Sequence, residues 1–84
     1  MARFQIKSFE PEAVVFDTAS GDTHFLPPLT VALFRMIQNN PGITVDEMHV
    51  ALASQLSLET GPDLTHQTDE ALASLRQIGL LEAP

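Results

Sequence analysis

Apolar and polar residues alternate along the first part of the chain, which is the pattern of strands with one buried face. In residues 3–9, Phe4 and Ile6 fall on one face and polar side chains on the other. This alternation predicts a half-buried strand. Residues 12–17 (EAVVFD) are richer in β-branched and aromatic residues, so we predict a second, more deeply buried strand there.

A four-residue turn follows the second strand. Its sequence is TASG, residues 18–21. Gly21 can adopt a positive φ without a Cβ clash, and we expect the hydroxyl of Ser20 to bond to the backbone. The returning strand is DTHFL, residues 22–26. These segments together predict a three-stranded antiparallel sheet with at least one open edge.

The remainder of the chain repeats its apolar residues at the helical period. Pro27 and Pro28 end the last strand, because proline cannot donate to a sheet but suits the first turn of a helix. We therefore predict a first helix over residues 29–40. Its apolar stripe consists of Leu29, Leu33, Met36 and Ile37.

Two further helices are predicted after residue 43. Thr44 and Glu47 have the spacing of a capping box, which marks the start of the second helix. After a loop at residues 59–63, the third helix runs from about residue 65 to 78, and Gly79 is suited to end it. The predicted buried positions are Val45, Met48, Leu52 and Leu56 in the second helix, and Thr68, Ala71, Leu72, Leu75 and Ile78 in the third.

The predicted order of elements is β-β-β-α-α-α in one domain over residues 1–84. The second and third helices resemble a helix-turn-helix pair beside a small sheet. We therefore predict an α+β fold of the winged helix-turn-helix type. A chain of 84 residues, of which 44% are hydrophobic, has room for one core but not for a deep catalytic cleft.

The distribution of charge argues against nucleic acid as a partner. The net charge is −7, and residues 36–84 hold seven acidic residues against one basic residue, Arg76. Phosphate contacts need lysine or arginine, so this half of the chain would repel DNA and RNA. No apolar run approaches the roughly 20 residues of a spanning helix, and no signal-peptide pattern is present. We expect a cytoplasmic protein without a membrane partner.

Candidate catalytic and metal-binding groups are sparse. The chain has no cysteine, and His24, His49 and His66 fall in three different predicted elements. Lys7 lies on an exposed strand face and Ser20 in a turn, and neither has an activating base beside it. We predict no metal site, no cofactor and no enzymatic activity.

The open edge of the sheet is the remaining candidate for a function. An exposed edge strand can pair with an extended peptide whose side chains enter neighbouring pockets. Residues 22–26 would form one wall of such a groove and the third helix the other. The residues alone leave an alternative equally open, in which the helix residues only form the core and a second copy of the chain covers the edge as a homodimer.

The segment EAVVFDTASGDTHFLPPLTVALFRMI resembles the PqqD-like family of peptide chaperones, the precursor-peptide recognition elements of ribosomal peptide biosynthesis. It is most similar to the branch found beside HPr-kinase-related proteins. Pro27 is a departure, because the family usually has a polar residue there, and the side-chain N-cap is therefore missing. The residues that match the branch are Val14, Val15, Asp17, Ser20, Gly21, Asp22, Thr23, His24, Leu26 and Pro28.

The resemblance implies a non-catalytic protein that holds a leader peptide as an added strand and presents it to a modifying enzyme. Arg76 could meet an acidic side chain of the leader, or could simply favour the helix dipole. Carried over to this chain, the implied peptide-binding residues are Asp22, Thr23, His24, Phe25 and Leu26 in the third strand, and Leu72, Leu75, Arg76 and Gly79 in the third helix.

Two other functions remain open at this stage. One is an adaptor that docks on an HPr-kinase-related or similar kinase-like protein without binding a leader. The other is a nucleic-acid-binding winged helix, which the acidic half of the chain disfavours.

Overall fold

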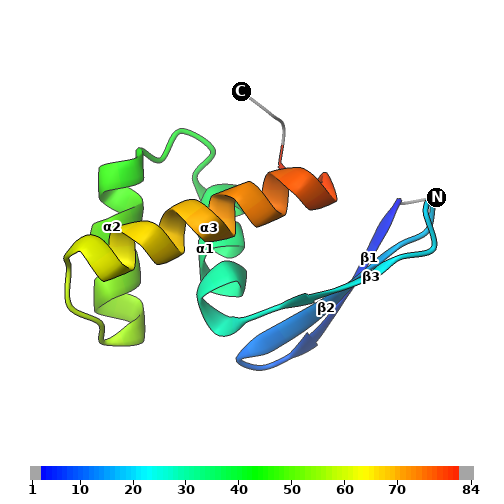
Figure 1. Ribbon diagram of the computed structural model, residues 1–84, viewed down its shortest axis with the longest axis horizontal. Coiled ribbons are helices and arrows are strands. Elements are labelled where there is room, and N and C mark those ends of the chain that lie inside the picture. The colour runs from blue at the N-terminus through cyan, green and yellow to red at the C-terminus, as the bar shows by residue number, and fades with distance from the viewer. Residues whose placement is uncertain (1–2, 82–84) are drawn as a thin grey trace.

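The computed structural model describes residues 3–81 of the chain. It contains three strands followed by three helices (Figure 1). The strands are β1 (Phe4–Phe9), β2 (Glu12–Asp17) and β3 (Thr23–Leu26), and the helices are α1 (Pro28–Asn39), α2 (Val45–Leu56) and α3 (Pro62–Ile78). The predicted order β-β-β-α-α-α and the α+β class are confirmed. Within the described residues, no helix has the length and apolar character needed to cross a membrane.

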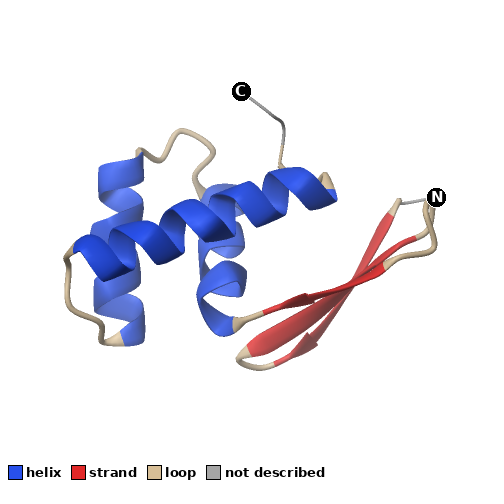
Figure 2. Ribbon diagram, in the orientation of Figure 1, coloured by secondary structure: helices blue, strands red, loops and turns tan. Residues whose placement is uncertain are grey.

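The three strands form an antiparallel sheet in the order β1-β2-β3, so β3 is an edge strand. The sheet projects as a twisted arm to one side of the three helices (Figure 2). One face of its base packs on the helical core through Ala13, Val15 and Leu26, each at most 2% exposed. Leu33, Leu52 and Leu75, one from each helix, are fully buried in the same cluster.

The first strand is less buried than its sequence pattern predicted. Phe4 packs against the edge of the core, but Ile6 is 46% exposed. The reason is that α1 contacts β2 and leaves the middle of β1 uncovered. The opposite face of the sheet is also open to solvent, and it carries the exposed rings of Phe9, Phe16 and Phe25.

The passage from β3 into α1 takes a single residue, Pro27. Its extended backbone (φ −65°, ψ 166°) turns the chain into the helix, and no side chain caps that end, in agreement with the missing polar residue. The helix begins at Pro28, one residue before the predicted start. The Pro27 carbonyl accepts the N–H of Val31 at 3.0 Å.

The capping box predicted for the second helix is confirmed. The Glu47 N–H donates to Thr44 Oγ1 at 3.2 Å, and the Thr44 N–H donates to Glu47 Oε1 at 3.0 Å. Met48 is buried as predicted, but Val45 is 45% exposed, so its predicted burial is wrong. Val45 is the first residue of α2, and the core does not extend over that end of the helix.

The third helix begins earlier than predicted, at Pro62 rather than near residue 65. The sequence pattern places Pro62 in a loop, but its missing N–H is no cost in the first turn of a helix. Thr65 secures this turn, because its N–H and its hydroxyl both donate to the Gly61 carbonyl, at 3.0 and 3.1 Å. Gly79 ends the helix in the left-handed conformation (φ +101°), as its position predicted.

We expect the Leu52→Ala variant to lose about 2–5 kcal/mol of unfolding free energy, because it leaves a cavity at a fully buried position. Val50→Ala is the matched control on the same helix, since Val50 is 65% exposed and its truncation should change stability by less than about 0.5 kcal/mol. Urea denaturation followed by circular dichroism measures both. Equal losses in the two variants would contradict the described core.

Candidate functional site

The open edge of β3 presents the backbone groups of Thr23 and Phe25. The Asp17 N–H donates to the Asp22 carbonyl at 2.8 Å, which makes these two residues a hydrogen-bonded pair. Because such pairs occur at every second residue of an antiparallel ladder, Thr23 and Phe25 direct their N–H and C=O groups away from β2. Among residues 3–81, no further strand lies on that side of β3.

The edge ends abruptly at Pro27. Proline has no N–H, and the Pro27 carbonyl is already occupied by the N–H of Val31. A strand added to this edge can therefore pair with the N–H and C=O groups of two residues of β3, Thr23 and Phe25. The hydrogen-bonding surface is short, so side chains must supply much of any selectivity.

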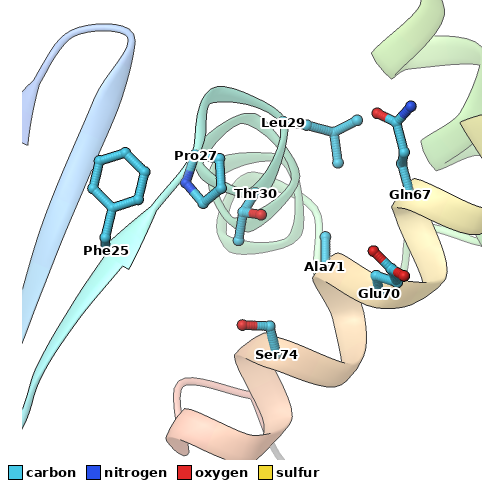
Figure 3. A pocket seen from close by; sticks show the side chains of 8 residues that line it. All are labelled: Phe25, Pro27, Leu29, Thr30, Gln67, Glu70, Ala71 and Ser74. Atoms are coloured by element: carbon cyan, nitrogen blue, oxygen red, sulfur yellow. The ribbon is translucent and has the colours of Figure 1, made fainter.

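Helix α3 faces this edge across a groove (Figure 3). The groove consists of two adjoining depressions of about 370 and 490 Å³, which share Phe25 and Ser74. We call these two depressions the edge groove. Its wall on α3 is one stripe with helical spacing, formed by Gln67, Glu70, Ala71, Ser74, Gln77 and Ile78.

The floor and the rim of the edge groove differ in polarity. Thr30 and Ala71 lie at the floor and are 6% and 4% exposed. Leu29 extends above them from the first turn of α1, while Gln67 and Glu70 stand along the rim on α3 (Figure 3). The side chains at the base of the groove are thus small, and those along its opening are longer and polar.

Three of the nine residues implied by the family resemblance line the edge groove directly: Thr23, His24 and Phe25. Asp22 is exposed immediately before β3. Leu26 belongs to β3, but its side chain is 1% exposed and faces the core.

The implied residues of α3 and its C-cap Gly79 lie one position further around the helix than the groove stripe. Leu72 and Leu75 are 6% and 0% exposed, so their side chains face the core. Arg76 and Gly79 are exposed and line neither depression of the groove. A Cβ on Gly79 would approach the Phe4 ring to 3.4 Å, which places Gly79 beside β1.

The groove stripe of α3 was missed because the implied residues were carried over from the family resemblance, whereas most residues of the stripe are polar or small. A signal was present in the sequence. Ala71 and Ser74 are small residues three positions apart, and Gln67, Glu70 and Gln77 continue the same stripe. This is a helix face on which another backbone can approach closely.

Asp17 has a structural role that the sequence did not reveal. Its carboxylate is 3% exposed and accepts hydrogen bonds from Arg3 Nε at 3.2 Å, Arg3 Nη2 at 3.1 Å and the Ala19 N–H at 2.9 Å. The hydrogen bond from Arg3 lowers the pKa of Asp17 to about 2, although desolvation acts in the opposite direction. Asp17 therefore ties β1 to the turn from which β3 begins.

The edge groove carries little charge. Of the described residues that line it, only His24 and Glu70 can ionise. Glu70 Oε1 lies 2.8 Å from His66 Nε2, one turn earlier on α3. Residues 3–81 contain no group of three or more histidine, aspartate or glutamate side chains arranged to hold a metal ion.

No protein-family model matches the sequence, and no curated protein matches it. A solved structure does. The chain is similar in fold to TbiB1 in complex with the TbiA(beta) leader peptide, with a TM-score of 0.74. The match covers 100% of this chain and 94% of that chain, at 17% sequence identity. At this identity, the similarity establishes the fold.

We expect the unfolding free energy of Asp17→Asn to fall less steeply between pH 4 and pH 2 than that of the wild-type protein. The folded-state pKa of about 2 is below the ordinary value of 3.8, so the ionised carboxylate contributes stability above about pH 4 that is lost as the pH falls towards 2. Asp22→Asn is the control at the other end of the same turn and should retain this loss. Urea unfolding between pH 7 and pH 2 measures it. An unchanged slope between pH 4 and 2 in Asp17→Asn would contradict the Arg3–Asp17 pairing.

Proposed function

We propose that the protein is a non-catalytic chaperone that binds a leader peptide as an added strand on β3 and presents it to a modifying enzyme. The observation that carries the proposal is the open backbone edge at Thr23 and Phe25 beside the edge groove. Strand addition satisfies such an edge, and neighbouring pockets then select alternate side chains of the peptide.

Two comparisons support a leader peptide as the ligand. TbiB1, whose fold this chain shares, was solved in complex with the TbiA(beta) leader peptide. The hairpin sequence also resembles the PqqD-like precursor-peptide recognition elements, in the branch found beside HPr-kinase-related proteins. An HPr-kinase-related protein or another modifying enzyme in the cytoplasm is therefore our proposed recipient of the bound peptide.

We propose different tasks for the binding residues. Thr23 and Phe25 supply the backbone donors and acceptors, and His24 and Ser74 line the groove where peptide side chains enter. Leu72 and Leu75 would act indirectly, because their burial holds α3 at its distance from β3.

The proposal is tested by an amide-resolved NMR titration with candidate leader peptides encoded near the gene. We expect shifts concentrated on β3 and on the α3 residues that line the edge groove, because those amides lie along the added strand. If no candidate causes shifts, and shifts appear only when an HPr-kinase-related protein is added, the protein is an adaptor and the chaperone function is rejected.

The backbone contribution can be isolated at Phe25. In Phe25→Pro the outward N–H is lost, but the ladder to β2 is kept, since proline is tolerated on an edge strand when its nitrogen faces solvent. Phe25→Ala is the matched control, because it removes the ring and keeps the N–H.

We expect Phe25→Pro to bind the leader roughly two- to tenfold more weakly than Phe25→Ala, which corresponds to one hydrogen bond of about 0.5–1.5 kcal/mol. Isothermal titration calorimetry measures the affinities, and circular dichroism confirms that both variants are folded. Equal affinities would exclude pairing of the peptide with this N–H.

A further inference from the structure

We infer that the edge groove selects a lysine or arginine side chain of the bound peptide, with the aliphatic stem over Ala71 and the cationic head at Glu70. The inference rests on the proposed function, because it takes a strand added to β3 as the ligand. It goes further by assigning the chemistry of a peptide residue and a specificity-determining residue of this chain.

The pleat of the sheet determines which peptide side chains reach the groove. Leu26 pairs with Ala13 on the face that packs on the helices, and Phe25 pairs with Val14 on the opposite face. In an added strand, side chains beside Phe25 lie on the outer face, and those beside His24 and Leu26 lie on the helical face. Every second peptide side chain is therefore directed into the edge groove.

The depression near the end of β3 has the chemistry of a site for a long cationic side chain. Its floor is formed by Thr30 and Ala71, with Leu29 above them, and its rim by Gln67 and Glu70 (Figure 3). Lysine and arginine bury an aliphatic stem along apolar surface and keep a charged head among polar groups. A purely apolar side chain would fill the floor but would add no partner to the Glu70 carboxylate, which has only His66 Nε2 beside it, at 2.8 Å from Oε1, among residues 3–81.

The charge of the groove has a definite sign. Among the described lining residues there is no lysine or arginine, and the Glu70 carboxylate is the acidic group. His66 contacts Oε1 of that carboxylate, and Oε2 has no hydrogen bond to any residue in the described range 3–81. Residues 36–84 also carry six more negative than positive charges, which repels an acidic peptide.

Arg76 does not reverse this preference. It lies on the neighbouring stripe of α3 and lines neither depression of the groove. The acidic leader side chain that Arg76 was suggested to meet would therefore lie outside the groove.

The test uses a phage-displayed library of random dodecapeptides as the probe. It is selected in parallel against the wild-type protein, Glu70→Lys and Asp69→Lys. Asp69 is the matched control, because it is the exposed neighbour of Glu70, undergoes the same change of charge and does not line the groove. Peptides that also bind Ser74→Trp, in which an indole fills the junction of the two depressions, are discarded.

We expect the wild-type protein and Asp69→Lys to enrich peptides with lysine or arginine at one position, and Glu70→Lys to lose that preference. In a synthetic version of an enriched peptide, replacing this lysine by methionine should weaken binding to the wild-type protein about two- to fivefold, the usual range for an exposed ion pair. The same replacement should leave the affinity of Glu70→Gln unchanged.

The failures of the inference and of the proposed function are distinguishable. The assignment to Glu70 is overturned if the groove-dependent peptides have no basic position. It is also overturned if Glu70→Lys still selects that basic position. In both cases peptide binding itself is unaffected. If no peptide is enriched by the wild-type protein and the NMR titration is also flat, the proposed function fails and the inference fails with it.

Discussion

The packing of α3 on α1 is the interaction on which the candidate site depends. Pro27 alone joins β3 to α1, so a helix that is held against α1 is also held at a set distance from the edge strand. Leu33 and Leu75 lie in the single core cluster that keeps these helices together, and Thr30 and Ala71 close the floor of the groove above it. The edge groove is therefore an outer surface of the core, and its width is determined by buried residues beneath it.

Much of this arrangement follows from the order of residues along the chain. The β-branched and aromatic residues of β2, the turn at Gly21 and the two prolines predict a hairpin whose last strand ends at a helix, and the capping box at Thr44 predicts where α2 begins. These features are local, so a single sequence carries them. The contact surface of α3 is not local. The groove stripe and the core stripe are one residue apart, about 100° around the helix, and the positions of α1 and α2 decide which one is covered.

The pairing of Arg3 with Asp17 illustrates a second limit on what the sequence can predict. The two residues are fourteen positions apart, and they meet because the register of β1 on β2 places Phe4 opposite Asp17. An acid beside a turn is common enough that its sequence context gives no sign of burial. The start of α3 was missed for a related reason, because a glycine followed by a proline is typical both of a loop and of the first turn of a helix.

The open edge also has a consequence for how copies of the protein meet. An unpaired strand is a template for another copy of the same chain, and soluble proteins that keep one must oppose aggregation. Here the template is only four residues long, a proline closes one end, and every molecule carries a net charge of −7. Two edges that met would form few hydrogen bonds while two like-charged bodies approached each other. The short edge, the proline and the net charge each oppose pairing between copies, and none of them covers the edge.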